Sequence, residues 1–180
     1  ESVCPPAIYN DKLLLIDQEN VLHLLNEKAE INQLDFEIMD QIKNSPSVYK
    51  DYLALYEKGF LGGIHLISKK GDELEDTLIP VDGIGFGSPC IFEDKDKVYI
   101  SFITQAGDLY VWNPQGELLE GFPENLEGVF FLNVKFVNGV LIALAEDGTL
   151  YKVGMDAQIT QVKIPNLSAK SGYITITDYD

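Results

Sequence analysis

A four-residue motif recurs four times along this 180-residue chain and constrains its fold more than any other feature. Each copy reads glycine or asparagine, any residue, leucine or isoleucine, and then histidine or tyrosine. The copies occupy residues 20–23, 62–65, 107–110 and 148–151. One repeat therefore takes about 40–45 residues, a length typical of chains built from several small β-sheet units. The spacing predicts an array of such units.

Each repeat contains four short segments with strand character. The first segments lie at 6–9, 46–49, 89–92 and 133–136, and three of them open on proline, which fits the start of a strand. The second segments, at 13–16, 53–56, 98–103 and 140–145, are almost continuously apolar, which predicts burial on both faces. The third segments carry the motif, whose glycine or asparagine predicts positive φ at the preceding turn. The fourth segments lie at 31–36, 74–80, 118–123 and 159–165. Residues 37–42 are expected to form one helical turn.

Four-stranded units of this length are the blades of β-propellers. Residues 107–123, together with the Ser45-Pro46 and Ser88-Pro89 strand starts, resemble the blade repeats of bacterial propellers of the pyrroloquinoline-quinone (quinoprotein-like) type. The resemblance implies an all-β propeller of four-stranded antiparallel blades, at about 5–44, 45–87, 88–131 and 132–171. Residues 172–180 then form the first strand of a fifth blade. The tryptophan-docking signature of the family is absent, so no quinone cofactor is implied.

The strand expected at 172–180 leaves three alternatives for the complete assembly. The chain is a fragment of a larger propeller, or it closes as four blades with the tail completing a seam. In the third alternative, partial rings close by self-association. All three avoid an open arc, which would expose sheet edges and apolar faces.

The composition restricts the kinds of partner that this chain can have. The net charge is −16, and all 13 basic residues are lysines. Because an acidic surface repels phosphate groups, we expect no nucleic-acid partner. No apolar run is long enough to cross a bilayer, so we expect no membrane span. The two cysteines, Cys4 and Cys90, are interpreted as separate thiols, with a single disulfide as the alternative.

Three features that could carry chemistry have simpler interpretations. His23 and His65 share a motif position with Tyr110 and Tyr151, so we interpret the position as a packing site with a polar tip. The glycine-rich segment 83–87 precedes a strand and lacks dinucleotide-binding spacing, so it is interpreted as a connection between blades. Asp178 and Asp180 have the opening spacing of a calcium loop, which makes Ca²⁺ a weak alternative to solvated turns. We otherwise expect no cofactor.

The candidate binding residues follow from propeller geometry. Turns between second and third strands and connections between blades open on one face, where loop aromatics are candidate contact residues. The candidates are Glu19, Phe60, Phe86, Gln105, Phe130 and Asp147. We therefore expect a non-enzymatic binding or scaffold module that recognises a protein partner or extracellular ligand, in a secreted, periplasmic or cell-surface location. The alternatives are part of a propeller hydrolase or lyase whose active site lies outside this chain, or an outer-membrane assembly scaffold lipoprotein.

Overall fold

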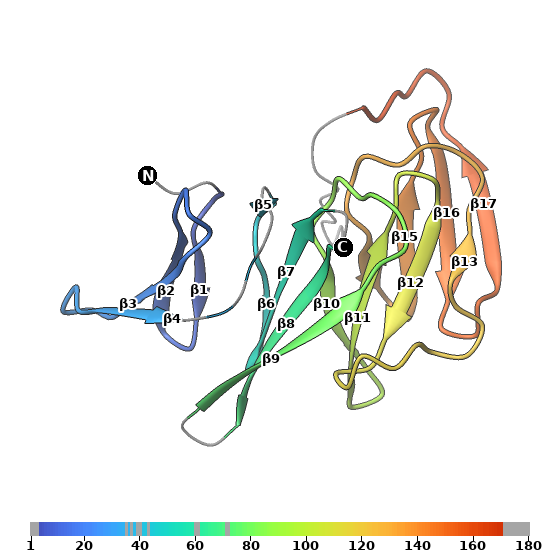
Figure 1. Ribbon diagram of the computed structural model, residues 1–180. Helices are drawn as coiled ribbons and strands as arrows, with labels where there is room; N and C mark the ends of the chain where they lie inside the picture. The colour runs from blue at the N-terminus through green and yellow to red at the C-terminus, as the bar shows by residue number, and fades with distance from the viewer. Residues whose placement is uncertain are drawn as a thin grey trace, which may run out of the picture.

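The chain folds into four separate antiparallel sheets; in Figure 1 the first lies at the left, the second beside it, and the third and fourth overlap at the right. The computed structural model describes residues 4–34, 36, 38, 41–42, 44–59, 62–70 and 73–170. No helix in this part of the chain is long and apolar enough to cross a bilayer. Cys4 and Cys90 are separate thiols, as the sequence favours.

In the described part of the chain the sheets contain 17 strands in sequence order. The first sheet contains β1 (Ala7–Tyr9), β2 (Lys12–Ile16), β3 (Leu22–Leu25) and β4 (Ile31–Leu34). The second contains β5 (Gln41–Ile42), β6 (Ser47–Tyr49), β7 (Tyr52–Lys58), β8 (Gly63–Lys70) and β9 (Glu73–Pro80). The third contains β10 (Cys90–Asp94), β11 (Lys97–Ile103), β12 (Asp108–Trp112) and β13 (Glu124–Asn125). The fourth contains β14 (Lys135–Val137), β15 (Val140–Leu144), β16 (Thr149–Gly154) and β17 (Ile159–Lys163).

Every sheet is an antiparallel meander in which consecutive strands pair. The second sheet has one irregularity: β5 and β6 pair with opposite ends of β7, so together they supply its first strand. The first full strands of successive sheets, β1, β6, β10 and β14, contact one another in that order. These strands therefore lie on the inner side of the row, and the fourth strands lie on the outer side.

The second strands of the two inner sheets are buried on both faces, because each of these sheets packs between two neighbours. In β7, Leu53 and Leu55 pack against the first sheet, whereas Ala54 and Tyr56 pack against the third. A third cluster of buried side chains joins the third and fourth sheets. The apolar runs that predicted burial on both faces are thus explained for the two inner sheets. In the first sheet burial alternates, and Leu13 of β2 is 36% exposed.

The motif turns behave as expected in three copies. Asn20, Gly107 and Gly148 have φ of 63°, 97° and 86°, inside the left-handed region that asparagine and glycine tolerate. Gly62 does not adopt this conformation, so the expectation is wrong for the second copy. Glycine is still required there, because a Cβ atom would lie 2.3 Å from the Glu57 carbonyl oxygen.

Two predicted elements are wrong, and others lie outside the described residues. The fourth strand of the third unit is β13 at Glu124–Asn125, and residues 119–123 form turns instead. The predicted helical turn at 37–42 is also wrong, because Gln41 and Ile42 pair with Lys58 and Glu57 as strand β5. The strand expected at 172–180 lies outside the described residues. The exact blade limits and the manner of closure stay predictions.

Candidate functional site

One face of the molecule gathers the turns between second and third strands with the connections between sheets. In a meander, a fourth strand ends at the same end of the sheet as the turn between the second and third strands. Hydrogen bonds join these segments directly. The Gln105 N–H donates to the Ile84 carbonyl (2.7 Å), the Phe130 N–H to the Gln105 carbonyl (3.0 Å) and the Glu146 N–H to the Val129 carbonyl (2.7 Å). We call this surface the loop face.

A cavity of about 280 Å³ opens where the connections between sheets meet. Residues 44–47, 86–88 and 131–133 line it, with Pro5 and Lys135. The Asn44 side-chain amide donates to the Gly87 carbonyl (2.9 Å), and the Ser47 hydroxyl donates to the Pro89 carbonyl. A Cβ atom at Gly87 would lie 2.6 Å from the Asn133 nitrogen, so only glycine permits this close approach. The walls of this loop-face cavity are therefore tied to one another.

Phe86 is an exposed aromatic side chain in the wall of the loop-face cavity. It is 40% exposed, and its ring meets that of Phe131 edge to face, with centroids 5.4 Å apart. The Lys58 ammonium lies 4.5 Å from the centroid of the Phe86 ring, within the range of a cation–π contact. The ring is therefore oriented by two neighbours while part of its surface stays open to solvent.

The other predicted site residues have different settings. Glu19 is exposed, and its N–H donates to Asp17 (2.9 Å). Gln105 is half-buried and holds the loop face through its backbone. Phe130 is only 2% exposed and packs in the core, so it offers no surface to a partner. Phe60, Asp178 and Asp180 lie outside the described residues.

Asp147 is exposed and belongs to a different part of the loop face. It accepts a hydrogen bond from the Thr149 N–H (2.9 Å) and pairs with the Lys163 ammonium. The ammonium and the N–H stabilise the carboxylate and lower the pKa of Asp147 to about 2. Together with Glu146 it lines a separate hollow, so the structure does not bring it to the Phe86 cavity.

A buried acid–histidine–acid cluster on the second sheet was not foreseen. Three side chains point to the same side of the sheet: Glu57 of β7, His65 of β8 and Asp76 of β9. His65 pairs with Leu55 and Leu78, and Glu57 and Asp76 each lie two residues from one of these partners, on the same side of their strands. The His65 Nε2 lies 2.9 Å from Glu57 Oε2, and its Nδ1 lies 2.7 Å from Asp76 Oδ2. His65 is 2% exposed and Glu57 is 4% exposed, so the centre of the cluster is enclosed.

Comparison with known proteins identifies the architecture. No family profile and no curated protein sequence matches the chain. Among solved structures, BamB from Moraxella catarrhalis is 13% identical with a TM-score of 0.54, over 88% of this chain and 42% of that protein. Virginiamycin B lyase from Staphylococcus aureus is 13% identical over 93% of this chain and 57% of the lyase. Its TM-score is 0.60 for a catalytically inactive variant with quinupristin and 0.61 for the selenomethionine protein. Both proteins are β-propellers.

The chain has the β-propeller fold. The sheets are blades one to four, and the predictions of propeller blades and of an all-β fold are confirmed. The chain spans roughly half the length of the matched structures, between 42% and 57%. At 13% identity the likeness shows the fold alone.

The buried cluster faces blade one, since Leu53, Leu55 and Ile67 on the same side of blade two pack there. Both ring nitrogens of His65 face carboxylate oxygens, and an oxygen of this kind accepts a hydrogen bond. Both nitrogens can donate at once only in the charged imidazolium, which two neighbouring carboxylates favour. Burial lowers the pKa of His65, but the hydrogen bonds and charges of Asp76 and Glu57 outweigh it and raise the pKa above its ordinary value.

The cluster has a structural role in the propeller. His65 is too enclosed to contact a substrate, and no group of three metal-ligating side chains in the described residues is arranged to hold an ion. Its three side chains connect three consecutive strands of blade two across the sheet.

Proposed function

We propose that this propeller is a non-enzymatic binding module that recognises a protein partner at the loop-face cavity. The exposed Phe86 ring in the cavity wall is the observation that carries the proposal. Aromatic side chains set in a concave surface are common centres of binding energy in protein interfaces. The hydrogen bonds between the cavity walls favour a preformed site, which lowers the ordering cost of binding.

The chemistry of the face defines the expected partner. An apolar side chain of the partner would enter the cavity beside Phe86 and Phe131, displacing water from both rings. The protein carries a net charge of −16, and Glu19 and Asp147 are exposed on the same face. A partner segment with basic residues on either side of its apolar anchor would therefore associate fastest.

Selection from a peptide display library tests this function. Peptides selected on the wild-type protein are expected to combine an aromatic or aliphatic anchor with lysine or arginine. By fluorescence anisotropy, Phe86→Ala should weaken their affinity by about 30-fold, the effect of losing roughly 2 kcal/mol at a hot spot. Leu118→Ala is the matched control, because Leu118 is 43% exposed but lies on the opposite face. Equal affinity of the peptides for wild type and Phe86→Ala would refute the proposal.

The alternatives from the sequence stay predictions. A lyase and BamB share the fold with this chain, and this fits both the enzyme alternative and the outer-membrane scaffold alternative at the level of architecture. No arrangement in the described residues favours either over a binding module. A location outside the cytoplasm and the weak calcium alternative also stay predictions.

A further inference from the structure

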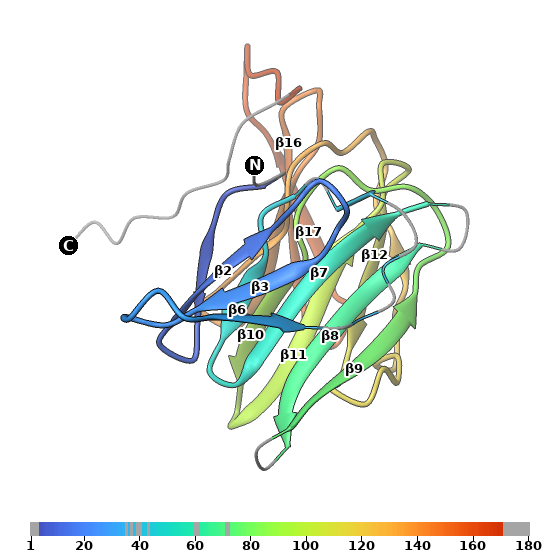
Figure 2. The ribbon, with the colours of Figure 1, turned by 60° about the vertical axis from the view of Figure 1, so that its left-hand side comes forward.

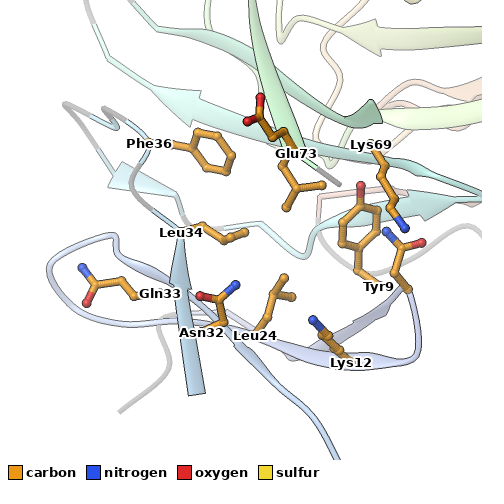
Figure 3. Close-up of a pocket in the computed structure, with 11 residues that line it drawn as sticks. Tyr9, Lys12, Leu24, Asn32, Gln33, Leu34, Phe36, Lys69 and Glu73 are labelled. Atoms are coloured by element: carbon orange, nitrogen blue, oxygen red, sulfur yellow. The ribbon is translucent and has the colours of Figure 1, made fainter. Parts of the chain in front are cut away.

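A second and larger cavity lies between blades one and two, on the face opposite the loop face. Its volume is about 530 Å³, within the range of about 300–1,000 Å³ typical of small-molecule sites. Strand β3 and the region around β4 supply one wall, and β8 and β9 supply the other. Figure 3 shows Leu24, Asn32 and Leu34 from blade one and Lys69 and Glu73 from blade two around this interblade cavity.

The interblade cavity follows from unequal strand lengths. Strands β8 and β9 have 8 residues each, whereas β3 and β4 have 4 each. The β8–β9 pair therefore extends beyond the end of blade one, as Figures 1 and 2 both show. Lys69 and Leu74, near the far end of β8 and β9, line the cavity, and Leu74 also packs against the core that blade two shares with blade one. A hollow remains where the two sheets no longer match.

The lining of the interblade cavity is divided between apolar and cationic groups. Figure 3 shows Leu34 and Phe36 on one side, and Lys12 and Lys69 on the side where Tyr9 lies. The Tyr9 hydroxyl donates to the Asp51 carbonyl (2.8 Å) and is therefore already engaged. The cationic end thus presents two ammonium groups beside a neutral ring.

Lys12 and Lys69 are the two lysines that line this cavity. Elsewhere on the surface Lys50, Lys70, Lys163 and Lys170 each pair with a carboxylate, whereas other described lysines, such as Lys95 and Lys152, do not. Within the described part of the chain, neither Lys12 nor Lys69 takes part in an ion pair of this kind. In a chain with 29 acidic residues and 13 lysines, two lysines that line one cavity without such partners leave a local positive charge. Glu73 lines the same cavity and is the single carboxylate among its lining residues.

We propose that the interblade cavity binds a small anionic amphiphile, such as a medium-chain carboxylate. The anionic head would lie between the Lys12 and Lys69 ammonium groups, which act as charge-assisted hydrogen-bond donors. The hydrocarbon portion would lie against Leu24, Leu34 and Phe36 and leave water. This site is separate from the loop-face cavity, so it is independent of the proposed protein-binding function.

The proposal is tested by titrating the protein with dodecanoate, below the critical micelle concentration of dodecanoate, in an isothermal titration calorimeter. Wild type should bind one dodecanoate per chain. Each of Lys12→Gln and Lys69→Gln should weaken binding by about tenfold, the effect expected for one charged hydrogen bond. The double variant Lys95→Gln/Lys152→Gln is the matched control for the double variant Lys12→Gln/Lys69→Gln. Lys95 and Lys152 are exposed, and both double variants change the net charge by the same amount. Dodecyltrimethylammonium, with the same chain and the opposite charge, should bind at least tenfold more weakly than dodecanoate.

Two further variants separate this cavity from other apolar surfaces. Leu74→Trp should fill the cavity and abolish dodecanoate binding, whereas Phe86→Ala should leave it unchanged. The proposal is overturned if wild type binds no dodecanoate, or if the control double variant loses as much affinity as Lys12→Gln/Lys69→Gln. Unchanged binding by Leu74→Trp would likewise overturn it, because the ligand would then lie elsewhere.

Discussion

Replacing His65 with glutamine removes the positive charge between Glu57 and Asp76 and leaves a side chain that still donates hydrogen bonds. In the native protein the ring nitrogens lie 2.9 Å and 2.7 Å from the two carboxylates. Removing one partner from a buried ion pair typically costs about 3–5 kcal/mol, because the remaining charge stays buried without compensation. We expect a loss of this size in the free energy of unfolding. It is a large part of the roughly 5–15 kcal/mol that stabilises a domain.

The pH dependence of the loss has a definite sign. The pKa of His65 is raised in the folded protein, whereas an unfolded histidine titrates near about 6.5. The stabilisation is therefore fully present below pH of about 6.5 and is lost as the pH rises through the folded pKa. The stability difference between wild type and His65→Gln should accordingly be largest at pH 6. It should shrink between a pH of about 6.5 and the folded pKa, by at most about 1.4 kcal/mol per pH unit, and stay constant above the folded pKa.

Urea unfolding followed by the fluorescence of Trp112 measures both effects. Trp112 is the one tryptophan of the chain and is buried between blades two and three. His23→Gln is the control, because His23 is a quarter exposed and pairs with Asp17 at 2.8 Å near the surface. That change should cost less than about 1 kcal/mol. Parallel pH profiles for wild type and His65→Gln, or a loss no larger than in the control, would refute this account of the cluster.

Two further predictions concern turns. Gly107→Ala should cost about 2–6 kcal/mol, because φ is +97° and a Cβ atom would lie 2.0 Å from the Leu126 carbonyl oxygen. Gly139→Ala, with φ of +83° and open space around the Cβ position, should cost only about 1–2 kcal/mol in the same urea assay. Equal losses would contradict the steric explanation. A carboxyl NMR titration should give Asp147 a pKa of about 2, and Lys163→Gln should raise it. Since the folded pKa of Asp147 is depressed, the stabilisation by Asp147 is present above pH of about 4 and is lost as the pH falls toward 2. An unchanged Asp147 pKa in Lys163→Gln would exclude Lys163 as the cause of the depression.

The blade architecture was predictable because a strand that is buried on both faces has an almost continuously apolar sequence. The apolar runs of β7 and β11 exist only because neighbouring sheets cover both sides of each strand. The outermost strand of a blade pairs with only one other strand, and its sequence pattern is less distinctive. In the third blade, Leu118 and Phe122 suggested a strand, but Phe122 enters the core from a turn. Leu118 forms a single bridge to Trp112 of β12, and the paired strand lies two residues beyond Phe122, at Glu124.

The candidate site was predictable only where topology decides it. The rule that connections and turns share a face placed Phe86 and Phe130 together, but it could not tell which ring points outward. The cluster around His65 depends on strand register. Glu57, His65 and Asp76 meet because Glu57 pairs with Gly63 and Asp76 with Ile67. Register across a sheet is set by turn geometry, and spacing along one sequence does not reveal it.

The histidine-or-tyrosine position of the motif connects packing with the loop face. The Tyr110 hydroxyl donates to the Asp82 carbonyl (3.1 Å), and the Tyr151 hydroxyl donates to the Glu127 carbonyl (2.6 Å). Both carbonyls belong to the connection that enters the same blade, and these connections continue into the walls of the loop-face cavity. The position is thus a packing site with a polar tip in blades three and four, where the tip fixes the incoming connection. In blade two the same position holds His65, which bonds to carboxylates of its own sheet instead. The repeat therefore orients the loops that carry Phe86, although no residue of the motif lines the cavity.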